Sequence, residues 1–143
     1  MARQSVVIDP SIALKCLLPE ADSEAALAVV DACVPQAPEW LALECADVLA
    51  RRVATGELDR ASAAAALADL ELLPIVYVAD LALARPALEI ALETGSPIQD
   101  CLYLALAVDR NLQLLTADRT LLEALEGHPQ LFVRVDLLSE RAG

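Results

Sequence analysis

Four acidic residues, Asp9, Glu44, Asp100 and Asp118, stand in sequence contexts where a carboxylate could do chemistry. Asp9 and Asp118 each follow a short apolar stretch that is typical of a buried strand, and each precedes a segment typical of a helix. Asp is also among the best helix N-caps, because its side chain accepts hydrogen bonds from the free N–H groups of the first turn. For each of these two residues alone, a cap and a functional role are both open interpretations.

Asp100 is harder to explain as a cap. Ser96 is expected to cap the helix that begins there, and Gln99 to complete a capping box, so Asp100 is not needed for that purpose. The segment 101–108, CLYLALAV, is apolar on all sides and predicts a buried helix. A buried carboxylate must be paired, protonated or bound to a metal, and the pattern therefore favours a functional role.

Glu44 is the weakest of the four when taken by itself. It flanks the apolar stripe of a helix predicted over 37–57, where it could simply be a boundary residue. Asp47 is a competing acid on the same helix, one turn further on. The pattern alone does not choose between them.

A hard divalent cation would explain the four carboxylates if the fold brings them together. Without a cation they would repel one another and some of their pKa values would rise. Mg²⁺ prefers oxygen ligands, whereas zinc sites use His and Cys, which do not accompany these acids. The cysteines are scattered without C-x-x-C spacing, and the single histidine, His128, lies in a loop. The chemistry that fits such a cation site is metal-assisted hydrolysis of a phosphate ester. Nothing suggests a nucleotide-binding enzyme, because there is no Gly-rich phosphate loop.

The elements that must position these acids are short apolar strands interleaved with helices. We expect strands at 5–8, 75–78, 112–118 and 131–135. This alternation predicts an α/β fold with a parallel sheet covered on both faces. Ligands bind beyond the carboxyl ends of the strands in such sheets, which is where Asp9 and Asp118 are expected to lie.

The composition indicates one globular domain, 1–143, with a core of Ala, Leu and Val, because 57% of the residues are apolar and only 3% are aromatic. No apolar run approaches the length of a membrane span, and no signal peptide is recognisable, so we expect a cytoplasmic protein without membrane contact. The net charge of −12 argues against a broad nucleic-acid footprint and suits a basic protein partner or a group of acids that holds cations.

The chain resembles the PIN-domain ribonucleases, and among them the VapC-type toxins of type II toxin–antitoxin pairs. The resemblance lies in four segments that follow in the same order and at similar spacing as in that family, and together they cover most of the chain. They are VVIDPSIALKCLLPE, APEWLALECADVLARRVATGEL, GSPIQDCLYLALA and LLTADRTLL.

The resemblance implies a role for six residues. It selects Glu44 on its helix and assigns metal binding and catalysis to the four acids. Ser11 and Thr116 match the family's accompanying hydroxyls, which would orient carboxylates, water or phosphate, although capping explains each almost as well. The assigned acids are Asp9, Glu44, Asp100 and Asp118.

The implied protein is a Mg²⁺- or Mn²⁺-dependent endoribonuclease with a three-layer α/β/α sandwich. Such proteins usually form homodimers and are inhibited by an antitoxin, whose basic C-terminal segment the negative charge would suit. Lys15, Arg51, Arg52 and Arg119 are candidates for RNA contacts, although solvated surface positions explain each of them better. Two alternatives remain: a non-catalytic PIN-like module that binds a partner, and a metal-dependent nuclease or phosphatase with a substrate other than RNA.

Overall fold

A five-stranded parallel sheet forms the centre of the computed structural model, which describes residues 3–141. The strand order is β3-β2-β1-β4-β5, so β1 and β4 lie side by side in the middle. The parallel α/β fold expected from the sequence is confirmed. The strands are β1 (Ser5–Ile8), β2 (Val34–Pro38), β3 (Val76–Val78), β4 (Leu114–Thr116) and β5 (Val135–Leu137).

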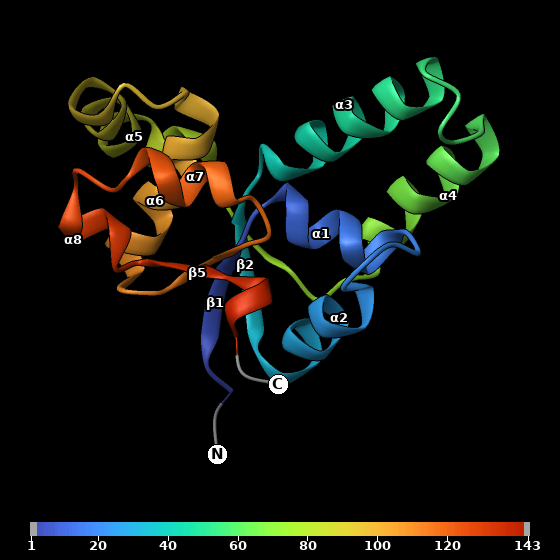
Figure 1. Ribbon diagram of the computed structural model, residues 1–143, viewed down its shortest axis with the longest axis horizontal. Coiled ribbons are helices and arrows are strands. Elements are labelled where there is room, and N and C mark those ends of the chain that lie inside the picture. Colours follow the sequence, from blue (N-terminus) through green and yellow to red (C-terminus); the bar gives the residue numbers. More distant parts are fainter. Residues whose placement is uncertain (1–2, 142–143) are drawn as a thin grey trace.

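Helices cover both faces of the sheet and complete a three-layer sandwich (Figure 1). The chain runs from β1 through β2 to β3 at one edge of the sheet, and then crosses back to β4 and β5 on the other side of β1. Because crossovers between parallel strands are right-handed, the reversal of direction puts the later helices on the opposite face from the earlier ones. One face carries α1 (Pro10–Leu17), α2 (Ser23–Ala32), α3 (Leu41–Ala54) and α4 (Arg60–Leu70). The other carries α5 (Asp80–Thr94), α6 (Ile98–Arg110), α7 (Arg119–Ala124) and α8 (Pro129–Phe132), and the 3-10 turn η1 (Leu138–Glu140) follows β5. Within residues 3–141, no helix is both long and apolar enough to cross a membrane.

The core is densest around α6, as its apolar sequence predicts. Residues 101–107 are all buried, and α6 packs against α5 and against β1, β2 and β4. Strand β4 is buried along its whole length. The acid motifs that flank these elements are therefore attached to buried segments of the core.

Two strand predictions were wrong. We expected helices over 22–34 and 37–57 with no strand between them, but residues 34–38 form β2 between β1 and β3. The sequence analysis missed this strand because of Pro35 and Pro38. Proline has no backbone N–H to donate to a neighbouring strand, and it normally argues against an inner strand. The last strand is β5, not 131–135, because Pro129 begins the short helix α8 in the first-turn position that proline favours.

One prediction about a helix end was also wrong. The side chain of Ser96 does not cap α6, and its buried Oγ has no hydrogen-bond partner within residues 3–141. The helix begins at Ile98 directly after Pro97, whose extended backbone leads into it. Helix α5 begins at Asp80 and contains Pro86 in its interior.

Replacing Leu104 of α6 by Ala is expected to lower the free energy of unfolding by about 2–5 kcal/mol, because a fully buried side chain would leave a cavity. Leu81 of α5 is 88% exposed, so Leu81→Ala should change it by less than about 0.5 kcal/mol. Urea denaturation followed by circular dichroism measures both. Equal losses for the two variants would contradict the central position of α6.

Candidate active site at the carboxyl ends of β1 and β4

The acid motifs meet at the point where the sheet reverses its strand order. Strands β1 and β4 are parallel neighbours, with Ile8 beside Leu115, so both end at the same edge. The chain leaves β1 in one direction and returns on its other side, which makes this edge a topological switch point. Open α/β sheets bind ligands there, because the flanking loops diverge and leave a crevice.

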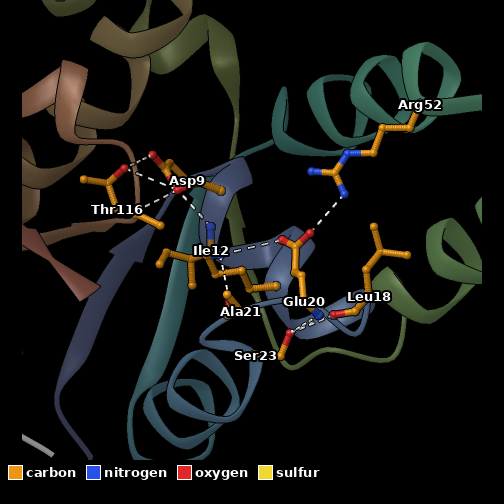
Figure 2. A network of polar contacts seen from close by, with 11 residues as sticks. Asp9, Ile12, Leu18, Glu20, Ala21, Ser23, Arg52 and Thr116 are labelled. Carbon is orange, nitrogen blue, oxygen red and sulfur yellow. Dashed lines mark hydrogen bonds and ion pairs between the residues drawn. The ribbon is translucent and has the colours of Figure 1, made fainter. Parts of the chain in front are cut away.

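Asp9 is buried at this edge and is joined to both strands. Its Oδ1 accepts the backbone N–H of Ile12 at 3.3 Å, which caps α1 as one interpretation of the sequence predicted. The Ser11 hydroxyl also donates to Oδ1, and the Thr116 hydroxyl, which comes from β4, donates to Oδ2. Figure 2 shows Thr116 and the N–H of Ile12 directed at Asp9. The bond to Thr116 is more than a helix cap requires.

The two hydroxyls also hold the loop that follows β4. The backbone N–H of Ala117 donates to Ser11 Oγ at 2.8 Å, and the N–H of Asp118 donates to Thr116 Oγ1 at 3.0 Å. Each hydroxyl thus accepts from the loop and donates to Asp9. The carboxylate and the loop are fixed relative to each other by one polar network.

Asp118 caps α7, as the second cap interpretation predicted. Its Oδ1 accepts the backbone N–H of Thr120 at 3.0 Å and also the hydroxyl of Thr120. Unlike Asp9, Asp118 is exposed to solvent.

Glu44 and Asp100 approach the same region from α3 and α6, and both are half-buried. The Tyr103 hydroxyl donates to Glu44 Oε1 at 2.7 Å and holds this carboxylate against α6. Asp47 instead pairs with Arg51 at 3.2 Å, where both side chains are about two-thirds exposed at 68% and 69%. Glu44 rather than Asp47 therefore makes the buried contact.

The environment of Asp9 disfavours its charged form. Burial raises the pKa of Asp9 from 3.8 to about 6, and the negative charge of Asp118 adds to this effect. The hydrogen bonds from Ser11, Thr116 and Ile12 act in the opposite direction but do not outweigh burial.

Each of the four acids interacts electrostatically with two of the others. Burial raises the pKa of Glu44, and the charges of Asp100 and Asp9 raise it further. Burial also raises the pKa of Asp100, with the charge of Asp118 adding to it. The fold has therefore brought together the four acids that the sequence singled out, close enough that each feels another's charge.

The chemistry of these donors fits a hard divalent cation. All are carboxylates, and a cation would relieve both their burial and their mutual repulsion. Within residues 3–141, however, no group of three or more His, Cys, Asp or Glu side chains is arranged so that it could hold a metal ion. Asp9, Glu44 and Asp118 are each hydrogen-bonded to neighbouring protein groups instead. The candidate ligands are gathered by the fold but are not closed into a coordination shell.

The four cations considered as RNA contacts each form an ion pair. Glu20 Oε2 accepts a hydrogen bond from Arg52 Nη1 at 3.0 Å, and Glu20 Oε1 lies 3.9 Å from Lys15 Nζ. The contact with Arg52 connects the loop after α1 to α3 (Figure 2). Arg51 pairs with Asp47, as noted, and Arg119 lies 3.6 Å from Glu140. Arg51 and Arg119 are mostly exposed, as the surface interpretation expects, whereas the side chains of Lys15 and Arg52 are only 17% and 30% exposed.

Two contacts at the site were missed by the sequence analysis. The bond from Tyr103 to Glu44 had a usable signal, because a tyrosine in a buried apolar helix needs a partner for its hydroxyl. The second contact had none: Asp80, the first residue of α5, accepts the backbone N–H of Trp40 at 3.1 Å, and its charge also raises the pKa of Glu44.

In the presence of a chelator, stability is expected to fall as Asp9 ionises. Because the pKa of Asp9 is higher in the folded state, its charge costs nothing below pH 3.8 and destabilises the fold increasingly as the pH rises through about 6. The full cost is about 3 kcal/mol. Urea denaturation between pH 4 and pH 7 should show this loss for the wild type and a smaller one for Asp9→Asn. The exposed Asp47→Asn should follow the wild type, and identical profiles for all three proteins would refute the assignment.

Comparison with known proteins supports this architecture. The family model of the PIN domain matches residues 6–126. No curated protein matches the chain. Among solved structures, PAE2754 from Pyrobaculum aerophilum is similar with a TM-score of 0.66 and 23% identity, over 96% of this chain and 91% of that one.

Two further solved structures are also similar. VapC20 of Mycobacterium tuberculosis, a toxin that cleaves the sarcin-ricin loop, has a TM-score of 0.64 and 18% identity, over 83% of this chain and 94% of that one. VapBC2 from Rickettsia felis, bound to a DNA fragment from its promoter, has a TM-score of 0.59 and 10% identity, over 94% and 98%. At these identities the likeness concerns the fold alone. The family match, in contrast, spans most of the sequence and includes all four acids, and the chain belongs to the PIN domain family.

Proposed function

We propose that this protein is a Mg²⁺- or Mn²⁺-dependent endoribonuclease and that it acts as the VapC-type toxin of a toxin–antitoxin pair. The observation that carries the proposal is the buried Asp9 at the switch point, bonded across the sheet to Thr116 and coupled to the charge of Asp118. Membership of the PIN domain family supports a nuclease, and the resemblance of the four acid segments to PIN-domain ribonucleases supports RNA as the substrate.

The four acids would hold the cation in this proposal. A bound divalent cation supplies charge neutralisation at the phosphate oxygens and activates water for attack on phosphorus. Ser11 and Thr116 keep the oxygens of Asp9 oriented, and Tyr103 keeps Oε1 of Glu44 in place. Such fixed partners reduce the reorganisation that is needed when substrate arrives.

Purified wild-type protein is expected to cut RNA when Mg²⁺ or Mn²⁺ is supplied and to stop when a chelator is added. Asp9→Asn should lose cleavage, because it removes a charge that no neighbour can replace. Thr116→Val should lower the rate about 10–100-fold, because it only frees the orientation of Asp9. Asp47→Asn, with its exposed side chain, is the matched control and should cut normally. Cleavage by Asp9→Asn at the wild-type rate would contradict the proposed site.

The alternative is a PIN-fold module that binds a partner without cleaving. One observation favours it: within residues 3–141 the acids are not arranged to hold a metal ion. Thermal denaturation with and without Mn²⁺ separates the two proposals, because a cation that binds only the folded state raises the melting temperature. No shift together with no cleavage of RNA would favour the binding module, whereas cleavage of DNA or a phosphate monoester would move the proposal to another substrate.

The proposed partner is an antitoxin with a basic C-terminal segment, and we expect the toxin itself to be a cytoplasmic homodimer. The net charge of −12 suits a basic segment. A groove between α3, α4 and β3 also suits one, because Leu43, Leu67 and Tyr77 form an apolar floor with Glu39 and Glu71 among its lining residues. An amphipathic helix with basic residues beside its apolar face would complement this groove.

Tyr77→Lys is expected to weaken antitoxin binding at least about 10-fold. The new lysine would lie against the apolar face of the antitoxin helix and would repel its basic residues. Tyr77 is 41% exposed, so the change should leave the fold intact. Isothermal titration with the antitoxin measures the affinity, and Leu81→Lys, on the exposed face of α5, is the control. Equal affinities for the two variants would exclude this groove, and light scattering of the toxin alone tests the dimer.

A further inference from the structure

A pocket of about 330 Å³ adjoins the acid cluster between α3 and the start of α6. One wall consists of Trp40, which directly precedes α3, and of one face of α3 that includes Glu44. The opposite wall consists of Pro97, Gln99 and Asp100 at the start of α6. Because Glu44 and Asp100 belong both to this pocket and to the acid cluster, the two sites are continuous. We call it the Trp40 pocket.

The backbone of Trp40, the residue directly before α3, is fixed by two hydrogen bonds. Its backbone N–H donates to Asp80 Oδ1 at 3.1 Å, and its carbonyl accepts the N–H of Glu44 at 3.1 Å. Trp40 and Glu44 are therefore one helical turn apart on the same face. The indole Nε1 is buried and has no hydrogen-bond partner within residues 3–141, so the exposed part of this side chain is apolar ring.

The charges of the Trp40 pocket restrict what can enter it. Glu44, Asp47 and Asp100 all line it, and its one basic side chain within the described residues, Arg51, is already paired with Asp47 at 3.2 Å. An anion such as phosphate would be repelled here. A neutral, flat group with polar edges would not be repelled, and a nucleobase is such a group.

The size and lining of the pocket also fit one nucleobase. Its volume is at the lower end of the range of about 300–1,000 Å³ found for small-ligand pockets, which is too small for a folded partner segment. Aromatic rings stack on any base, and a glutamine amide can both donate to and accept from a base edge. Trp40 and the exposed Gln99 supply these two functions from opposite walls.

We propose that the Trp40 pocket binds the base next to the scissile phosphate, with Trp40 stacking on the base and Gln99 contacting its edge, and that it contributes to the choice of the RNA sequence that is cut. This inference rests on the proposed function, because it takes the scissile phosphate to lie at the neighbouring acids. Trp40 and Gln99 are positioning and specificity residues in this account, and the hydrolysis itself belongs to the acid cluster.

The fluorescence of Trp40 provides a direct test, because it is the single tryptophan of the chain. The Asp9→Asn variant, which is expected not to cut RNA, is titrated in the presence of Mg²⁺ with short single-stranded oligoribonucleotides of different base composition. We expect saturable quenching that depends on the base. An oligomer of the same length with abasic sites is the matched control and should not quench. No quenching, or equal quenching by the abasic oligomer, would overturn the proposal.

Kinetics of two Trp40 variants separate stacking from simple packing. Trp40→Leu keeps an apolar side chain but removes the aromatic face, and should raise KM for RNA roughly 5- to 100-fold with a smaller change in kcat. Trp40→Phe should recover most of this loss. A purely structural tryptophan would instead lower kcat and the melting temperature without changing KM, which would overturn the proposal. If Trp40→Leu does not fold, the fluorescence titration of the protein that retains Trp40 decides.

Gln99→Ala tests the contact with the base edge. We expect the preferred base beside the cleaved bond to become less distinct, as measured by sequencing the cleavage products. An unchanged preference would contradict the role of Gln99. The exposed Glu93→Ala on α5 serves as the control and should leave the preference intact.

The failure of this inference can be distinguished from failure of the proposed function. RNA cleavage without any fluorescence response would retain the nuclease and refute the Trp40 pocket as a base site. Base-dependent quenching without cleavage under any metal condition would support base binding and refute the hydrolytic function.

Discussion

The site depends on the pairing of β1 with β4. Asp9 and Thr116 are 107 residues apart in the sequence, yet they are joined by a hydrogen bond because their strands are parallel neighbours that end at the same edge. This pairing creates the switch point of the sheet and thereby opens the crevice at which the acid motifs meet. The remaining strands and both helical layers serve to bury this central pair.

The cost of burying Asp9 is only partly offset within the protein. Two hydroxyls and a backbone N–H favour its charged form, but burial and the charge of Asp118 still keep its pKa well above the ordinary value. An arrangement that leaves a carboxylate in this condition sacrifices stability, which is typical of functional sites rather than of structural ones. The same pressure acts on Glu44 and Asp100.

The distribution of charge bears on how a nucleic acid could approach. Lys15 and Arg52 are committed to Glu20, where they brace α1 against α3, and Arg51 is committed to Asp47. A protein of net charge −12 that reserves its cations in this way cannot rely on a broad basic surface. Recognition of a nucleic acid through neutral groups beside the acids, such as an aromatic ring and an amide, is consistent with this shortage of unpaired cations.

Much of the architecture could be predicted from the sequence, because periodicity and capping are local properties. The strands β1, β3 and β4, the burial of α6 and the caps at Asp9 and Asp118 all follow from patterns within a few residues. Strand β2 was missed because its prolines contradict the local rule, and the expected Ser96 cap did not form.

The sequence by itself determined which acids follow strands or open helices, and hence which residues deserved consideration. Only the tertiary structure decided that Asp9 meets Thr116, that Tyr103 holds Glu44 across a separation of 59 residues, and that Trp40 and Gln99 face one pocket. Contacts of this kind depend on strand order and helix packing, which no local pattern encodes. The physical reason is that a side chain's partner is chosen by the whole path of the chain, whereas its secondary structure is chosen mainly by its neighbours.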